Sequence, residues 1–310
     1  MLVRADEEQS SAGSDAATYS LRRVGRPFTK DYTVYFEQSH DGTPVSPFHD
    51  IPLYHDKHKE IFNMVVEVPR FTNAKFEISR SKFLNPITQD RERDGSLRFN
   101  LNVFPYKGYL WNYGALPQTW ENPHSINPDT GEKGDNDPID ACEISRAVAN
   151  SGDVKQVKVL GILGLIDQKE TDWKLIVIDV NDPLANKMKD IDDVERYFRG
   201  LLDATRDWFR IYKIPEGHEP NDFAFAGMYR NRKDALKMIG ECSDAWKGLV
   251  RGEIEPGGVS IDNTTLKNTP GKLDPKKIEL PPDEALSPVH LDKKLDEWYY
   301  VDRNSWSGSP

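Results

Sequence analysis

The segment 135–140 reads Asp-Asn-Asp-Pro-Ile-Asp and places three carboxylates, Asp135, Asp137 and Asp140, in one short loop that a proline stiffens. Like charges so close together repel one another unless cations are present. Hard divalent cations such as Mg²⁺ take oxygen ligands, and proteins often hold them with a few carboxylates together with substrate phosphates. The loop therefore predicts a divalent-metal site and phosphoryl chemistry.

Two other interpretations of this loop use the same residue types. Asp, Asn and Pro are ordinary turn residues, so a solvated turn explains the segment without any ligand. A calcium loop of the EF-hand type needs an oxygen ligand at position 5, glycine at 6 and glutamate at 12. Counting from Asp135, these positions hold Ile139, Asp140 and Arg146, which excludes the calcium loop.

Further charged residues lie on both sides of this loop in the sequence. Asp167, Asp172 and Lys174 flank a loop between two predicted strands, where a charged hairpin tip is the simpler explanation. Charged residues also occupy the outward faces of predicted strands, namely Lys75, Glu77 and Arg98. Folded together, these segments would line one cavity with the carboxylates and cations that phosphoryl transfer requires. Asp140 could then bridge two metals that share one water.

The elements that must position these residues are mostly strands. From about residue 20 to 180, short alternating segments are broken by Gly, Pro and Asn, which predicts strands. In 97–103 the apolar residues share one face, and Asn100 and Asn102 face outward. The segment 172–180 is apolar on both faces except near its ends, which predicts a buried strand with polar ends. Short strands with glycine-bearing connections favour a closed barrel over an open parallel sheet.

After residue 180 the apolar period changes to three or four residues. It predicts a helical region up to about residue 212, with Asp192 or Asp193 as a cap and Gly200 as a break. A second helix is predicted over 232–249. The apolar stripes of both helices, which include Tyr197, are typical of core packing.

Both ends of the chain differ from its centre. Residues 1–17 are polar and predict a disordered extension, with neither a secretory core nor an arginine-rich transit peptide. The catalytic domain is predicted over 18–250, and 251–310, rich in proline and lysine, as an irregular wrap of the same domain. The aromatic cluster at 298–300 predicts docking on the domain or on a partner subunit.

The composition limits the classes of function. The 310 residues carry 41 basic and 51 acidic side chains, a net charge of −10, which disfavours binding to nucleic acid or anionic membranes. The two cysteines, Cys142 and Cys242, exclude a disulfide framework and fit a reducing compartment. The longest apolar run, 159–166, is far shorter than the roughly 20 residues of a membrane span. A soluble, cytoplasmic protein is predicted, and a mitochondrial location is disfavoured.

Several short motifs are spread over residues 28 to 250. They comprise 66–70, 73–75, 97–99, 112–114, 117–120, 134–140 and 170–174. Together they closely resemble soluble inorganic pyrophosphatases of the eukaryotic type. The resemblance implies an α+β, mainly β fold, with a five-stranded closed barrel of the oligonucleotide-binding (OB) type, flanking helices and extended termini. It also implies a homodimer that hydrolyses pyrophosphate to two phosphates with several Mg²⁺ ions, for which Mn²⁺ could substitute.

The resemblance assigns roles to the carboxylates of this sequence. Asp135, Asp140 and Asp172 match ligands of a first metal, and Asp140 also reaches a second. Asp167 and Asp172 match ligands of a metal carried by the substrate. Asp137 matches the general base that deprotonates the nucleophilic water, so a metal-bridged hydroxide would attack the pyrophosphate.

The resemblance also implies a substrate-binding set. The matching residues are Lys75 on the leaving-phosphate side, Arg98, Tyr113, Lys174, Tyr212 and Lys213. Glu77 matches an outer metal ligand and Glu67 a member of the water network. Tyr109 matches a proton donor, although a tyrosine with a usual pKa of roughly 10 could equally donate a hydrogen bond without ionising.

Two positions depart from the family pattern. Phe71 stands where tryptophan is common, near the expected dimer surface, and Ser145 stands where glycine is usual.

Two other functions compete with pyrophosphate hydrolysis. A two-metal nuclease or nucleotidase is disfavoured by the negative charge, and a barrel that only binds phosphate or nucleic acid would gain nothing from the metal carboxylates.

Overall fold

The computed structural model describes residues 18–302, so the extension predicted at 1–17 lies outside the described residues. The strands are β1 (Tyr19–Val24), β2 (Thr33–Gln38), β3 (Pro44–Val45), β4 (Tyr54–Asp56), β5 (Ile61–Val68), β6 (Phe76–Ile78), β7 (Ile87–Gln89), β8 (Asn102–Val103), β9 (Asn112–Ala115), β10 (Lys133–Gly134), β11 (Asp140–Glu143), β12 (Val154–Asp167), β13 (Glu170–Asp179), β14 (Asp222–Phe223), β15 (Arg230–Asn231) and β16 (Trp298–Tyr299). The helices are α1 (Ile191–Tyr197), α2 (Leu201–Ile211) and α3 (Arg232–Val250), with 3₁₀ turns at Ile214–Glu216, Ala224–Gly227, Pro275–Lys277 and Lys293–Asp296. The fold is mainly β, as the sequence predicts.

Five strands of the largest sheet each pair with two others of the same set. β5 pairs antiparallel with β9 and with β12, and β12 pairs antiparallel with β13. β11 pairs antiparallel with β9 and parallel with β13. The order β5-β9-β11-β13-β12 therefore returns to its first strand.

Alternate residues of β13 face two different apolar clusters. Leu175 and Val177 belong to the cluster that α3 covers, whereas Ile176 and Ile178 belong to the cluster that includes α2. Because side chains alternate along a strand, Lys174 lies on the same face as Ile176. The predicted buried strand with polar ends is confirmed, and its charged end faces α2.

The helices follow the predicted periodicity, with two differences. Gly200 separates α1 from α2 as predicted. It is the N-cap of α2, with a left-handed backbone at φ +82° that glycine adopts without steric cost. The cap of α1 is Asp190 rather than Asp192 or Asp193, since the Asp190 side chain accepts from the first turn and Asp193 bonds back to the Asp190 N–H. Tyr197 is exposed rather than in the core. None of the described helices is long and apolar enough to cross a membrane.

The prediction of a continuous strand over 97–103 is wrong. Only β8 is regular there, and Asn100 and Asn102 are buried rather than outward. The Asn100 side-chain amide donates to the Tyr109 hydroxyl at 2.9 Å, and the Asn102 side-chain oxygen accepts from the Gly108 N–H at 2.9 Å. These hydrogen bonds offset the cost of burying two amides, which a polarity pattern does not reveal.

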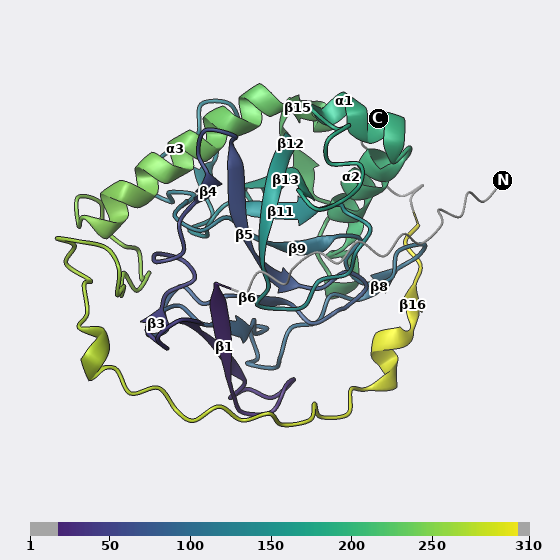
Figure 1. The fold of residues 1–310 in the computed structure, drawn as a ribbon. Helices are drawn as coiled ribbons and strands as arrows, with labels where there is room; N and C mark the ends of the chain where they lie inside the picture. Colours follow the sequence, from purple (N-terminus) through teal and green to yellow (C-terminus); the bar gives the residue numbers. More distant parts are fainter. Residues whose placement is uncertain (1–17, 303–310) are drawn as a thin grey trace.

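The segment after α3 is irregular except for short turns and β16, and it runs along the edge of the molecule in Figure 1. It contacts the N-terminal strands, where the Glu284 N–H donates to the Arg23 carbonyl at 2.6 Å. Further on, β16 pairs parallel with β8, and the Trp298 ring lies 5.6 Å from the Phe104 ring. The aromatic cluster at 298–300 therefore docks on the domain.

Candidate active site

One cavity of about 230 Å³ collects almost all the site residues that the sequence predicts. It is lined by Lys75, Glu77, Arg98, Tyr109, Tyr113, Asp135, Asp137, Asp140, Asp167, Asp172, Lys174, Tyr212 and Lys213. Glu67 does not line it but is buried nearby, where its carboxylate accepts from the Ile78 N–H at 2.7 Å. Residues far apart in the chain are thus brought to one place by β6, β9, β11, β13 and the end of α2.

Asn136 fixes the shape of the three-aspartate loop. Its backbone is left-handed, with φ +75°, a conformation that Asn tolerates better than most residues. The Trp120 indole donates to the Asn136 carbonyl oxygen at 2.9 Å, and the Asn136 amide donates to the Gly257 carbonyl at 3.1 Å. The Asp137 N–H donates to Asp135 Oδ1 at 3.0 Å. Contacts outside the loop therefore hold two neighbouring carboxylates in fixed positions.

The loop lies directly against Glu121, a residue that the sequence analysis missed. The Glu121 N–H donates to the Asp137 carbonyl at 2.8 Å, and the Asn136 N–H donates to the Glu121 carbonyl at 2.9 Å. A Cβ on Gly134 would lie 2.4 Å from the Glu121 backbone, so glycine is required for this close approach. The signal in the sequence was the position of Glu121 directly after the motif at 117–120.

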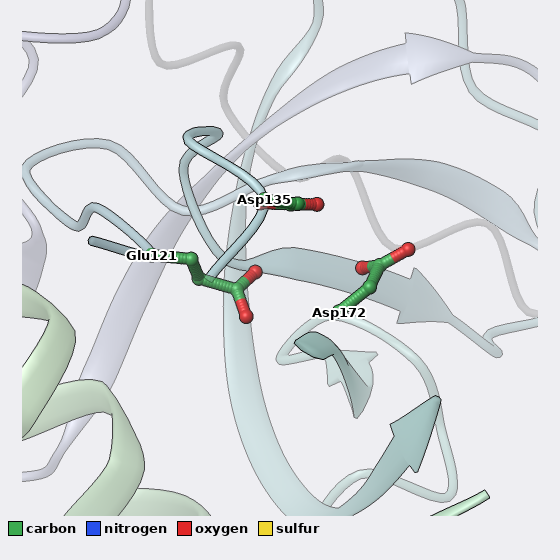
Figure 2. Close-up of side chains that lie close together, drawn as sticks. All are labelled: Glu121, Asp135 and Asp172. Atoms are coloured by element: carbon green, nitrogen blue, oxygen red, sulfur yellow. The ribbon is translucent and has the colours of Figure 1, made fainter. Parts of the chain in front are cut away.

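Among the residues that the structure describes, Glu121, Asp135 and Asp172 form a group of carboxylates with one oxygen from each within 4.8 Å of the others. Figure 2 shows the three side chains converging from separate segments. Glu121 and Asp172 are buried, and Asp135 is half-buried. Because only oxygen atoms meet here, the group suits a hard cation.

Lys174 is the cation closest to these acids. The parallel register of β11 and β13 places Asp140 opposite Lys174, and Asp172 lies two residues earlier on the same face. The Lys174 ammonium donates to both carboxylates and, at 2.9 Å, to the Tyr113 hydroxyl, which in turn donates to Asp140. One lysine is thus shared between two buried acids.

The pKa values of Asp135, Asp137 and Asp172 are raised. Burial, reinforced by Glu77, raises the pKa of Asp137 to about 8, although Arg80 opposes the shift. Burial also raises the pKa of Asp172 to about 7, against the effect of Lys174. The pKa of Asp135 lies well above its ordinary value because of burial and nearby aspartates. Bound cations would favour the charged forms and lower these pKa values.

A second group of residues that line the cavity is balanced in charge. Lys213 Nζ lies 2.7 and 2.5 Å from the two oxygens of Asp167, and the Tyr212 hydroxyl donates to Asp167 at 3.1 Å. Burial acts to raise the pKa of Asp167, but Lys213 outweighs it and holds the pKa below the ordinary value. Nearby, Arg98 donates to Asp90 at 3.1 Å.

We call two groups of residues the acidic half and the paired half of the site. The acidic half comprises Asp135, Asp137, Asp140 and Asp172, which line the cavity, and Glu121, which lies beside them but outside the cavity lining. The paired half comprises Asp90, Arg98, Asp167, Tyr212 and Lys213. Arg80, which the sequence analysis missed, borders the acidic half. Its Nε lies 3.3 Å from Asp137 Oδ1, and its Nη1 donates to the main-chain carbonyl of Asp135 at 3.1 Å. Arg80 closely follows β6 in the sequence, whereas nothing in the sequence indicated that Asp90 would meet Arg98.

Comparisons with known proteins identify the family of the chain. A family model described as "Inorganic pyrophosphatase" matches residues 64–247. An inorganic pyrophosphatase of Neurospora crassa is 55% identical over 287 residues, covering 92% of this chain and 98% of that protein. The chain belongs to the inorganic pyrophosphatase family. Its fungal relatives also include an inorganic pyrophosphatase of Schizosaccharomyces pombe, 50% identical over 94% of this chain and 99% of that protein.

Solved structures of the pyrophosphatase family agree. The inorganic pyrophosphatase of Schistosoma japonicum has a TM-score of 0.81 at 41% identity, covering 91% of this chain and all of that chain. A recombinant inorganic pyrophosphatase of T brucei brucei has a TM-score of 0.70 at 39% identity, covering 78% of this chain and 73% of that chain. The predicted family is confirmed, and the chain is an inorganic diphosphatase, a hydrolase.

The acidic residues of this pyrophosphatase have the chemistry of a metal-binding site. The carboxylates of the acidic half outnumber the cations that touch them, and Glu121 Oε2 is buried without a hydrogen-bond partner among the described residues.

Tyr109 also lines the cavity, and burial raises its pKa to about 12 against the effect of Lys75. Its phenol is therefore neutral near pH 7, so it can donate a hydrogen bond or a proton.

Proposed function

We propose that this chain hydrolyses inorganic pyrophosphate to two phosphates, with Asp137 as general base. Magnesium would be held by Asp135, Asp140, Asp167 and Asp172, with Glu77 as an outer ligand, and manganese could substitute. The observation that carries the proposal is the cavity in which a carboxylate cluster faces buried lysine, arginine and tyrosine donors. That mixture suits an anionic substrate that brings further cations.

The roles of the protein groups follow from their positions. When bound, divalent cations would lower the pKa of a shared water and offset phosphate charge. Asp137 would accept the proton of that water, and its raised pKa suits a general base near neutral pH. The phosphates would be held by Lys75, Arg98, Tyr113, Lys174, Tyr212 and Lys213. Glu67 would order the water network, and Tyr109 would donate a proton to the leaving phosphate.

The test is phosphate release from pyrophosphate with Mg²⁺, compared with release from a nucleotide and cleavage of an oligonucleotide. We expect release from pyrophosphate alone and a loss of about 10²- to 10⁴-fold in Asp137→Asn, the scale of a general base. Asp244→Asn, which changes an exposed aspartate of α3, is the matched control and should keep the wild-type rate. Cleavage of the oligonucleotide without release from pyrophosphate would favour the nuclease.

We propose further that the five-strand ring is a closed OB-type barrel within a catalytic domain at 18–250, in a cytoplasmic enzyme of phosphate metabolism. The segment that begins at residue 251 would wrap this domain, and residues 303–310 of the predicted wrap lie outside the described residues. The buried free thiols Cys142 and Cys242 suit a reducing compartment. The net charge of −10 disfavours nucleic-acid substrates and binding to membrane surfaces.

We propose a homodimer, which the exposed aromatic rings of Phe71, Phe104, Trp298 and Tyr300 support. Apolar rings on a surface are typical of association sites. Sedimentation across micromolar concentrations should give twice the chain mass, and Trp298→Ser should shift the equilibrium towards the monomer. A monomer at every concentration would contradict the dimer.

A further inference from the structure

Asn100 is a buried amide that touches the cavity only through Tyr109. Just 1% of its surface is exposed, and its Nδ2 donates to the Tyr109 hydroxyl oxygen at 2.9 Å. Its Oδ1 is buried without a hydrogen-bond partner among the described residues. An apolar side chain of similar size would avoid the cost of that unpaired oxygen. The amide of Asn100 therefore suits a role that stability alone does not require.

The segment 72–73 holds the backbones of Asn100 and Tyr109 together. The Asn100 N–H donates to the Asn73 carbonyl at 2.8 Å, and the Asn73 side-chain amide donates to the Asn100 carbonyl at 2.6 Å. The Tyr109 N–H donates to the Thr72 carbonyl at 3.1 Å. The amide and the phenol are thus fixed relative to one another by the same short segment.

Packing also fixes the ring of Tyr109, which leaves the torsion of its O–H bond as the remaining freedom. The residue is 2% exposed, and its ring centroid lies 5.2 Å from that of Tyr113 and 5.0 Å from that of Trp208. A phenol oxygen can accept one hydrogen bond and donate its proton in another direction. Because the Asn100 amide occupies the oxygen, the proton must point away from Asn100.

The direction away from Asn100 leads into the cavity. Tyr109 lines the cavity, whereas Asn100 does not and lies behind the phenol. Three cations act on this phenol, namely Lys75, Arg98 and Lys174, and none of them can accept a proton. An oxygen of a bound phosphate can accept it.

We propose that Asn100 is a positioning residue that keeps the Tyr109 proton directed at an oxygen of the bound phosphate. The inference rests on the proposed function, in which Tyr109 serves the leaving phosphate. A donor that is aimed before the substrate arrives needs no reorganisation during the reaction. Without the Asn100 amide, the cations of the cavity would attract the phenol oxygen and turn its proton away.

A double-mutant cycle in kcat, measured with pyrophosphate and Mg²⁺, tests this role. Asn100→Leu removes the donor at similar size. We expect kcat to fall about 3- to 10-fold, the scale of one hydrogen bond, while KM changes less than about 2-fold. In the Tyr109→Phe background, which has no hydroxyl to direct, Asn100→Leu should lower kcat by less than about 2-fold.

Two further variants separate this role from general damage to the fold. Asn100→Ser introduces a smaller polar side chain that is too short to reach Tyr109, so it should repeat the loss seen with Asn100→Leu. Asn63→Leu is the matched control and should keep the wild-type kcat. Asn63 is also a buried amide, and it donates to the Pro52 carbonyl at 2.7 Å but does not line the cavity.

Denaturant unfolding of the metal-free protein tests the contact without catalysis. Asn100→Leu and Tyr109→Phe should be non-additive, with a coupling of about 3- to 10-fold in the unfolding equilibrium constant. Additive effects on unfolding would overturn the proposal, as would equal losses of kcat in both backgrounds. A wild-type or higher kcat in Asn100→Leu would also overturn it, because the phenol would then not depend on Asn100 for its direction. Intact coupling in a protein that releases no phosphate from pyrophosphate would refute the proposed function instead.

Discussion

The acidic half and the paired half of the site differ in how the charge of their carboxylates is balanced. In the paired half, Asp167 has Lys213 on both its oxygens, so the protein itself compensates the carboxylate. In the acidic half, Glu121, Asp135 and Asp172 crowd together, and Lys174 contacts only one of these three. The difference indicates that, without metal, the protein itself compensates Asp167, whereas the crowded acids of the other half keep an excess of negative charge.

The largest effect is expected from breaking the paired half. Lys213→Met would leave the half-buried Asp167 without its lysine partner, although the Tyr212 hydroxyl would still donate to it, and we expect it to destabilise the metal-free protein at pH 7 by about 2 to 3 kcal/mol. Denaturant unfolding measures this change. Lys247→Met removes an exposed helix pair and should cost less than about 1 kcal/mol. Equal stability of the Lys213 variant and wild type would mean that the pair is not a stabilising feature.

The pH dependence of the metal-free protein should report on the acidic half and its surroundings. The folded-state pKa values of Glu67, about 8, and Asp172, about 7, lie above the ordinary values of roughly 4. The folded state then binds more protons than the unfolded state, so this stability is fully present below the ordinary pKa and is lost as pH rises through 7 to 8.

We therefore expect the melting temperature in EDTA to fall by at least about 4 °C between pH 5 and pH 8, since 1 kcal/mol corresponds to roughly 2–4 °C. Saturating Mg²⁺ should reduce the fall, because bound cations stabilise the ionised carboxylates. A melting temperature in EDTA that stays level over this range would show that the crowded acids carry no such penalty.

Removing a carboxylate from the acidic half should act in the opposite direction to removing Lys213. Asp135→Asn keeps an oxygen for the Asp137 N–H and deletes one repelling charge. We expect it to stabilise the metal-free protein by about 1 kcal/mol at pH 8, within the range of other stabilising substitutions, and to weaken Mg²⁺ binding. Denaturant unfolding in EDTA and calorimetry with Mg²⁺ measure the two effects. If Asp135→Asn destabilised the protein in EDTA, repulsion among the carboxylates of the acidic half would be contradicted.

The smallest effect is expected at the border of the acidic half. The Arg80 side chain is 40% exposed and its Nε lies 3.3 Å from Asp137, so solvent screens the pair. Arg80→Gln should change stability by no more than about 1 kcal/mol and should lower kcat/KM by less than about 5-fold. Steady-state kinetics with pyrophosphate checks the second value. A much larger loss would make Arg80 a substrate-binding residue rather than a peripheral partner.

Local patterns in the sequence determined a large part of this molecule. The buried strand β13 and the helix α3 could be predicted because apolar period and burial are properties of contiguous residues. The loop at 135–140 was recognisable because three carboxylates close in sequence must also be close in space. These features need no knowledge of distant contacts.

Only the tertiary structure decided which distant groups meet. Asn100 and Asn102 are polar and yet buried, because Tyr109 and Gly108 supply hydrogen-bond partners that the strand pattern does not contain. The position of Glu121 beside Asp172 depends on how the segment after β9 packs against β13. The sequence by itself determined that the chain carries acids and cations for phosphoryl chemistry. The packing of distant segments decided which of these acids contact a lysine and which do not, because charge balance depends on distances between segments.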